Sequence, residues 1–171
     1  RLQESLIGPD GLRVKLGDGK SAEFFGLKTP GRRFVYVIDR SSSMASYDQR
    51  FPKANEQLLR SVLQLRSRQQ FFVVYFNTGP YPMFSPAVAS ASINADRKTK
   101  KQLVAWVQTV FPGGGTDPAS SLQMALRLKP DAIFLLTDGE FGSHVLDLLH
   151  RENPAGDGQV SINTIAIVSH A

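Results

Sequence analysis

Short apolar segments alternate with longer amphipathic ones from residue 33 onward, and this alternation constrains the fold more than any other feature of the sequence. Residues 34–38 and 132–136 contain only apolar and aromatic side chains, with no charged or amide position on either face. A strand of this kind is buried on both sides, which is typical of a parallel sheet between two layers of helices. The sequence therefore predicts an α/β fold whose mostly parallel sheet is covered on both faces.

The same patterns indicate where the elements lie. We expect strands at 34–38, 71–76, 132–136 and about 160–168, and helices at about 49–67, at about 95–110, after Asp117-Pro118 and at about 143–151. Trp106 lies on the apolar face of the second predicted helix, so it is expected to be a core residue. Prolines between positions 80 and 86 confine any strand near 81–85 to an edge of the sheet.

Residues 1–32 differ from the rest of the chain because glycine-rich turns interrupt them and they carry only a short apolar patch. We expect them to form an N-terminal arm that packs at a sheet edge, and residues 33–171 to form the domain itself. The chain begins with Arg1, so we expect it to be a piece of a longer protein. Its longest apolar run, residues 71–76, is far too short for a membrane-spanning helix. No membrane span is expected within the chain, and no localisation is predicted.

The charge of the chain is basic, with 20 Lys and Arg against 15 Asp and Glu and a net charge of +5. All of the excess lies in residues 1–90, where the basic side chains are scattered and not interleaved with aromatic ones, so no nucleic-acid partner is expected. One dense basic cluster, Arg97 to Lys101, opens a predicted helix. We interpret it as a solvated helix face, with a phosphate-binding patch as the alternative. The absence of cysteine excludes thiolate metal sites and thiol nucleophiles.

Polar residues follow two of the predicted strands, where ligands bind in sheets of this kind. Asp39, Ser41 and Ser43 come directly after the strand at 34–38, and their spacing lets all three side chains point the same way. Asp138 follows the strand at 132–136, and Thr116 follows three glycines in a loop between helices. A cluster built only from oxygen ligands suits a hard cation, Mg²⁺ before Ca²⁺ or Mn²⁺, and disfavours zinc.

These residues resemble the metal-ion-dependent adhesion site of the von Willebrand factor type A domain family, whose pattern is Asp-x-Ser-x-Ser followed by a distant Thr and a distant Asp. Asp39, Ser41 and Ser43 match the first piece, Thr116 matches the second, and Asp138 in Leu-Leu-Thr-Asp-Gly matches the third. The resemblance covers about residues 33–168. It implies a Rossmann-like three-layer sandwich with one short antiparallel edge strand. The chain stops about where the last strand and closing helix of the family would begin, so the domain is expected to lack its final helix.

The resemblance also implies how the site works. Ser41, Ser43 and Thr116 would coordinate Mg²⁺, with Mn²⁺ or Ca²⁺ as alternatives, while Asp39 and Asp138 would act largely through water. Neutral hydroxyl ligands leave the ion much of its positive charge, so an Asp or Glu of a protein partner, or of the parent chain, is expected to complete its coordination. The predicted function is a metal-dependent protein-binding module and not an enzyme.

Other interpretations compete with this one. The same residues fit a Mg²⁺-dependent phosphoryl-transfer or hydrolase enzyme that uses Asp39 and Asp138 as metal ligands and Glu140 or His144 as general base. They also fit simple caps for the helices that follow the two loops. Arg40, inside the first motif, is expected to contact either a partner carboxylate or solvent.

Overall fold

The computed structural model describes residues 6–7, 12–46, 49–139 and 141–167. In chain order its elements are β1 (Leu6–Ile7), β2 (Arg13–Val14), β3 (Ser21–Phe24), β4 (Leu27–Pro30), β5 (Arg33–Asp39), α1 (Ser43–Ser46), α2 (Arg50–Gln64), β6 (Gln70–Phe76), β7 (Pro80–Pro82), β8 (Ile93–Asn94), α3 (Arg97–Val107), α4 (Ala119–Arg127), β9 (Ala132–Thr137), α5 (Ser143–Glu152) and β10 (Ser161–Ala166). The predicted strands and helices from residue 33 onward are present, with boundaries that differ by a few residues.

The main sheet has six strands, in the order β10-β9-β5-β6-β7, with β8 also paired to β6. The first four of these strands are parallel, whereas β7 and β8 run antiparallel to β6. Two prolines begin and end β7, and its place at the edge leaves their missing N–H groups outside the ladder. The prediction of a mostly parallel sheet with a short antiparallel edge strand is confirmed.

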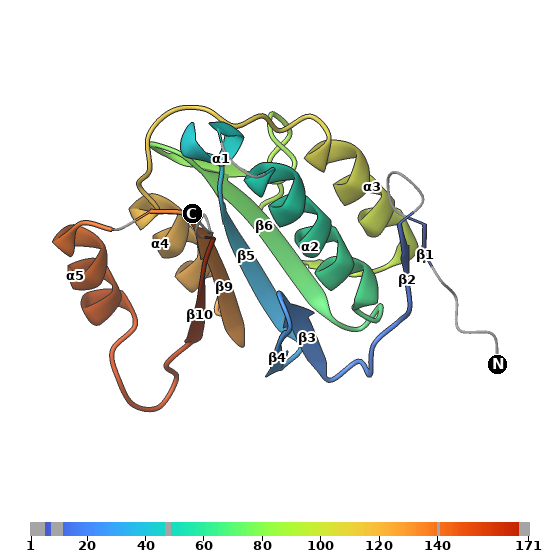
Figure 1. The fold of residues 1–171 in the computed structure, drawn as a ribbon. Coiled ribbons are helices and arrows are strands. Elements are labelled where there is room, and N and C mark those ends of the chain that lie inside the picture. The colour runs from blue at the N-terminus through green and yellow to red at the C-terminus, as the bar shows by residue number, and fades with distance from the viewer. Residues whose placement is uncertain (1–5, 8–11, 47–48, 140, 168–171) are drawn as a thin grey trace.

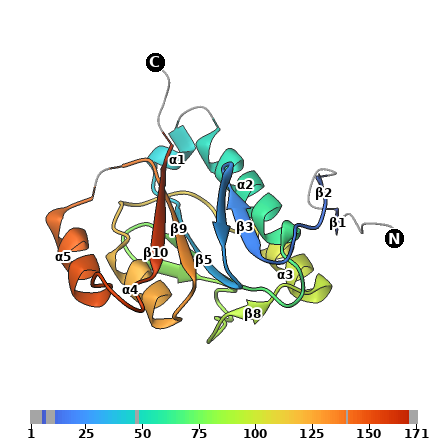
Figure 2. The same ribbon diagram turned by 90° about the horizontal axis from the view of Figure 1, so that it is seen from below.

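Helices cover the sheet on both faces (Figures 1 and 2). The helices α2 and α3 lie on one side of the strands, and α4 and α5 lie on the other. The central strand β5 is buried from Phe34 to Asp39, and all of β9 is buried, which explains why neither sequence alternates between apolar and polar residues. Trp106 on α3 is only 6% exposed and packs against Tyr75, so its expected place in the core is confirmed.

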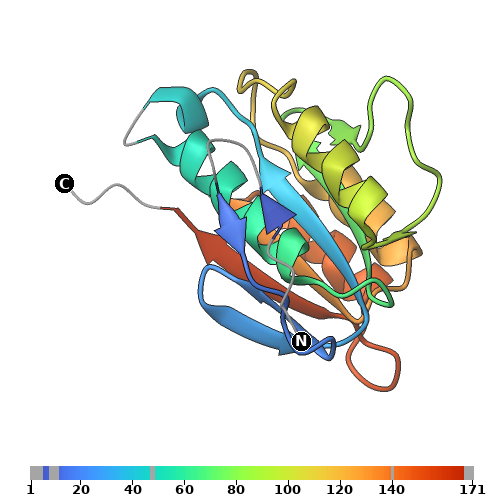
Figure 3. The ribbon, with the colours of Figure 1, turned by 90° about the vertical axis from the view of Figure 1, so that its right-hand side faces the viewer.

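The N-terminal segment packs against a face of the sheet, whereas an edge position was expected. Its hairpin, β3 and β4, forms a separate two-stranded sheet instead of extending the main one. Phe24 on β3 is 1% exposed, and its ring lies 5.5 Å from that of Tyr36 and 5.4 Å from that of Phe134. The hairpin thus shares a face with α2, while α4 and α5, in orange, lie behind the sheet in Figure 3. Burial of this large aromatic ring is a strong reason for the arm to lie on a face.

The basic cluster on α3 is not a uniformly solvated helix face. Arg97, Lys98 and Lys101 are exposed, but Lys100 is only 3% exposed. The Nζ of Lys100 donates to the backbone oxygen of Leu63 at 3.1 Å and to that of Leu65. Lys100 therefore satisfies carbonyl groups at the C-terminus of α2, where a positive charge is favourable. Helical spacing had placed it on the same surface as its charged neighbours.

Among the described helices, none combines the length and apolar character that crossing a membrane would require.

Candidate functional site

The predicted site residues gather at the edge of the sheet where the parallel strands end. In Figure 1 this is the upper end of β5, beside α1. Asp39 is the last residue of β5, Thr137 ends β9, and β5 lies between β6 and β9, so the chain leaves the central strand and returns on both sides of it. Such a point in a parallel sheet leaves a crevice open to ligands. We call Asp39, Ser41, Ser43, Thr116 and Asp138 the carboxyl-edge site.

Asp39 joins the two halves of the carboxyl-edge site. Its side chain is fully buried, and its Oδ1 accepts a hydrogen bond from the backbone N–H of Ser41 at 2.7 Å. Its Oδ2 accepts from the hydroxyl of Thr137 at 3.2 Å and from the backbone N–H of Asp138 at 3.3 Å. Because these donors come from loops that are almost 100 residues apart, the carboxylate fixes the first motif against the third. Thr137 is a contributor that the sequence interpretation missed, although it precedes Asp138 in the motif.

Ser41 and Ser43 point toward each other, as their spacing predicted. Their hydroxyl oxygens are 3.1 Å apart, and Ser41 is 1% exposed while Ser43 is half-buried. The backbone oxygen of Ser41 also accepts from the N–H of Met44 at the start of α1. Ser41 therefore meets the start of α1 through its backbone oxygen, whereas the capping interpretation required its side chain, which lies against the hydroxyl of Ser43.

The glycine loop is fastened to the first motif by backbone contacts. The N–H of Gly113 donates to the oxygen of Arg40 at 2.7 Å, and both the N–H and the hydroxyl of Ser42 donate to the oxygen of Gly114 at 3.0 Å. Gly114 has φ 79°, and a Cβ there would lie 2.9 Å from the side-chain nitrogen of Asn77. Only glycine meets both requirements without strain.

Asn77, directly after β6, holds the glycine loop from the other side. Its side-chain amide donates to the oxygen of Gly113 at 3.0 Å, and its backbone oxygen accepts from the N–H of Asp117 at 2.7 Å. The sequence interpretation did not single out Asn77, because it matches none of the three motif pieces. Its position just beyond a buried strand is the signal that could have identified it.

Thr116 is exposed and lies beside the third motif. A Cβ placed on Gly139 would be 3.8 Å from the Cγ2 of Thr116, so the glycine loop passes next to the turn that follows β9. The structure thus brings Thr116 close to the residue after Asp138. Together with the contacts of Asp39, this assembles the loops that carry all five predicted residues at one place.

Asp138 has a partner that the sequence interpretation did not predict. The guanidinium of Arg50, at the start of α2, lies 3.1 Å from its Oδ2, and the two side chains are 10% and 2% exposed. Arg50 had been counted among scattered basic residues. It is instead a buried cation inside the carboxyl-edge site, and an ion pair with so little solvent around it is strongly coupled.

The two carboxylates of the site affect each other's protonation. Burial raises the pKa of Asp39 above its ordinary value, and the neighbouring charge of Asp138 raises it further, while the hydrogen bonds from Ser41 act in the opposite direction. Two carboxylates held this close are each more easily kept ionised when a positive charge lies between them. Arg50 supplies one such charge to Asp138.

The surroundings of the site are both charged and aromatic. Arg40 places its guanidinium 4.3 Å from the ring centroid of Tyr81 and donates to the oxygen of Phe111 at 3.4 Å, so it contacts the protein itself. Phe111 is 71% exposed.

His144 lies 3.1 Å from the carboxylate of Asp117, which also accepts a hydrogen bond from the N–H of Ala119 and so caps α4.

Residue Glu140, the other candidate base, lies outside the described residues.

Hydrogen bonds from the backbone N–H of Ala119 and from His144 lower the pKa of Asp117, and the bond from Ala119 is the larger cause.

The donor set fits a hard divalent cation. It consists of hydroxyl and carboxylate oxygens, and no group of three or more His, Cys, Asp or Glu side chains that could hold a metal occurs within the part of the chain that the structure describes. That composition matches ions that prefer oxygen ligands and disfavours zinc or copper.

Comparison with known proteins gives concordant results. The family model of the von Willebrand factor type A domain matches residues 34–140. Inter-alpha-trypsin inhibitor heavy chain H4 from Homo sapiens is 27% identical over 143 residues, which is 74% of this chain and 15% of that protein. The chain therefore spans a small part of this relative's length.

Two solved structures share the fold. A von Willebrand factor type A protein from Catenulispora acidiphila superposes with a TM-score of 0.68 at 18% identity, over 88% of this chain and 37% of that one. The conserved hypothetical protein BatB from Bacteroides thetaiotaomicron superposes with a TM-score of 0.60 at 17% identity, over 80% and 66% of the two chains. The matched family model covers most of the domain, including Asp39 and Asp138, and the chain belongs to the von Willebrand factor type A domain family.

Proposed function

We propose that this domain binds a protein partner through a divalent cation held at the carboxyl-edge site, with Mg²⁺ as the resident ion and Mn²⁺ or Ca²⁺ as substitutes. The observation that carries the proposal is the position of Asp39, whose buried carboxylate joins the Ser41 loop to the Asp138 loop at the end of the central strand. An ion at this place would supply a positive charge with affinity for a partner carboxylate.

Each residue would have a defined part in holding the ion. The hydroxyls of Ser41 and Ser43 and the exposed hydroxyl of Thr116 are the neutral ligands, while Asp39 and Asp138 supply the negative charge behind them. Asp39 orients the other groups through its hydrogen bonds, as outer-shell carboxylates do in metal sites. A partner that presents Asp or Glu is therefore the ligand that the site would recognise.

The residues around the site support binding more than catalysis. Both oxygens of Asp39 already accept hydrogen bonds from its neighbours, and the carboxylate of Asp138 is paired with Arg50. Neither carboxylate is therefore placed to act as a nucleophile or a general base. Phe111, 71% exposed beside Arg40, offers an aromatic contact of the kind that contributes most to protein interfaces. We therefore propose an interaction module, and not a phosphoryl-transfer or hydrolase enzyme.

Paramagnetic Mn²⁺ provides a direct test of the metal site. Added at millimolar concentration, it should broaden the amide resonances of residues 39–43, 114–117 and 137–139 in the wild-type chain. Asp39→Ala should weaken this effect at least about tenfold in Mn²⁺ concentration, since loss of such a group costs 10–100-fold in metal affinity. The control is Asp157→Ala, an exposed carboxylate elsewhere. Broadening that is equal in both variants would refute the site.

The partner chemistry can be tested with displayed random peptides. Selection on this domain in Mg²⁺ should enrich peptides that contain Asp or Glu, and EDTA should release them. Phe111→Ala should reduce their binding about tenfold without changing the Mn²⁺ effect, because it removes an apolar contact and no ligand. Peptides that remain bound in EDTA, or that lack an acidic residue, would contradict the proposal.

A further inference from the structure

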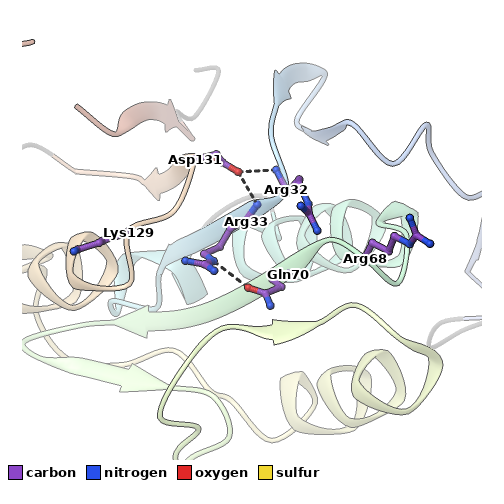
Figure 4. Close-up of a pocket in the computed structure, with 6 residues that line it drawn as sticks. All are labelled: Arg32, Arg33, Arg68, Gln70, Lys129 and Asp131. Carbon is purple, nitrogen blue, oxygen red and sulfur yellow. Dashed lines mark hydrogen bonds between the residues drawn. The ribbon is translucent and has the colours of Figure 1, made fainter. Parts of the chain in front are cut away.

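The edge of the sheet opposite the carboxyl-edge site carries a basic pocket. It has a volume of about 340 Å³ and is lined by Arg32, Arg33, Arg68, Gln70, Lys129 and Asp131, which we call the amino-edge pocket. These residues stand where β5, β6 and β9 begin, and Figure 4 shows them as sticks. Four cationic side chains against one carboxylate give the pocket a net charge of +3. The sequence separates Arg32 from Lys129 by 97 positions, so the scattered basic residues are brought together only by the fold.

The carboxylate of Asp131 in the pocket already accepts two hydrogen bonds from backbone groups. The Oδ2 of Asp131 accepts from the backbone N–H of Arg32 at 2.6 Å and from that of Arg33 at 2.9 Å. Gly31 makes this approach possible, because a Cβ at that position would lie 2.7 Å from the Cβ of Asp131. Asp131 thus holds the start of β5 against the start of β9 through main-chain groups. It leaves the cationic side chains of the pocket available to an outside anion.

One cation is fixed and the others are free to turn. Arg33 donates its Nε to Gln70 at 3.0 Å and its Nη1 to the oxygen of Leu128 at 3.4 Å. Within the described part of the chain, the side chains of Arg32, Arg68 and Lys129 make no hydrogen bond or ion pair, and all three are exposed. In Figure 4, Lys129 and Arg68 stand on opposite flanks of the pocket, with Arg33 and Arg32 between them. Charges spread in this way match a ligand with more than one anionic group.

Lys129 occupies a position where lysine is unfavourable. It follows Leu128, the C-cap of α4, with φ 50°, in the left-handed region that glycine usually fills after the end of a helix. A non-glycine residue at such a position carries backbone strain, and strained residues cluster at functional sites. Replacement by glycine would relieve the strain and remove the charge at the same time.

We propose that the amino-edge pocket binds a compact ligand that carries two or more phosphate or sulfate groups, independently of the metal. The volume accommodates several such groups, the available cations outnumber the carboxylate, and Arg33 gives the pocket a guanidinium of fixed orientation. Guanidinium groups form charge-assisted hydrogen bonds with these oxyanions.

The test is an amide NMR titration in EDTA at about 150 mM NaCl, a salt concentration that screens diffuse attraction. One arm uses tripolyphosphate, and the other uses a multiply sulfated disaccharide. Saturable shifts are expected at residues 32–33, 68–70, 129 and 131. Lys129→Gly and Arg68→Gln should each lower the affinity about tenfold, as loss of one charge-assisted contact would. Lys101→Gln, an exposed lysine on α3 outside the pocket, should change it less than about twofold.

The outcomes are distinct. The arm with the tighter binding identifies phosphate or sulfate as the source of the anion, provided that Lys129→Gly weakens it. If neither probe produces saturable shifts, or if Lys101→Gln weakens binding as much as Lys129→Gly does, the pocket is only a positively charged surface and the proposal is overturned. Asp39→Ala should leave the titration unchanged, so failure of the metal site does not affect this result.

Discussion

The same type of contact stabilises both edges of the sheet, although the charges around the two edges are opposite. At each edge one carboxylate receives two backbone N–H groups and joins neighbouring strands: Asp39 at the carboxyl edge and Asp131 at the amino edge. Asp39 is fully buried and has a second carboxylate beside it, whereas Asp131 is exposed among four basic side chains. The fold thus stabilises both edges in the same way, although the side chains around the two carboxylates carry opposite charges.

Each edge also contains a buried basic residue, and their partners differ. Arg50 at the carboxyl edge faces the carboxylate of Asp138, whereas Lys100 at the amino edge faces the carbonyl groups of Leu63 and Leu65. Carbonyl oxygens compensate a buried charge less completely than a carboxylate does. In agreement, burial lowers the pKa of Lys100 to about 8, against the smaller opposing effect of the Asp96 charge.

The largest effect is expected at the carboxyl edge. Arg50→Gln should lower the free energy of unfolding by about 3 kcal/mol, because it leaves the carboxylate of Asp138 buried without its counter-ion. Urea denaturation in EDTA measures the loss, and millimolar Mg²⁺ should recover part of it. The control is Arg97→Gln, an exposed arginine on α3. Equal stability of the two variants would show that the pair has no special role.

At the amino edge, the free energy of unfolding should depend on pH through Lys100. Since its folded-state pKa is about 8 and its ordinary value is 10.5, the unfolded chain binds more protons between these values. Its contribution to stability should therefore rise as pH increases from 8 to 10.5, by at most about 3 kcal/mol. The difference between wild type and Lys100→Met isolates this contribution, with Lys101→Met as the exposed control. A difference that does not vary with pH would contradict the assignment.

A smaller loss of stability is expected when the exposed carboxylate of Asp131 is removed. Asp131→Ala should destabilise the chain by about 1 kcal/mol, because water can accept the hydrogen bonds from the N–H groups of Arg32 and Arg33 in place of the carboxylate. Thermal unfolding measures the change against Asp157→Ala. Mn²⁺ broadening at the carboxyl-edge site should stay as in the wild type. A loss of metal binding in Asp131→Ala would mean that the two edges are coupled.

The smallest expected effect is a gain in stability. Lys129→Gly should raise the free energy of unfolding by about 0.5–1 kcal/mol, because glycine adopts φ 50° without strain. Chemical denaturation of the two chains at equal ionic strength measures it. Stability below that of the wild type would show that the lysine side chain makes a contact that compensates for its backbone.

The sequence predicted the parts of the molecule that depend on short-range patterns. Uniformly apolar strands indicated the parallel sheet, the prolines indicated the edge strand β7, and the spacing of Asp39, Ser41 and Ser43 placed them on one side of a turn. The loop that carries Asp138 could be assigned to the same edge because parallel strands end together. Thr116, in a loop between helices, was assigned through the resemblance to the family motif.

Contacts between distant segments could not be predicted in this way. Arg50 and Asp138 are 88 positions apart, and nothing in the sequence near either residue indicates the other. Lys100 shares its helical turn with exposed basic residues, so its burial depends on where α3 meets the end of α2. The amino-edge pocket combines the starts of three strands, and each of its arginines alone looks like an ordinary surface residue.

The bridge made by Asp39 also has a consequence for the order of events during folding. Its partners Thr137 and Asp138 lie at the end of β9, about 100 residues further along the chain. Chains are synthesised from the N-terminus, and contacts at such a sequence separation form late because of the entropy of closing the loop. A growing chain therefore displays the Ser41 loop long before the other half of the carboxyl-edge site exists. Under the proposed function, only a chain whose central strands have paired would offer the complete set of metal ligands, so partner binding would be confined to fully folded molecules.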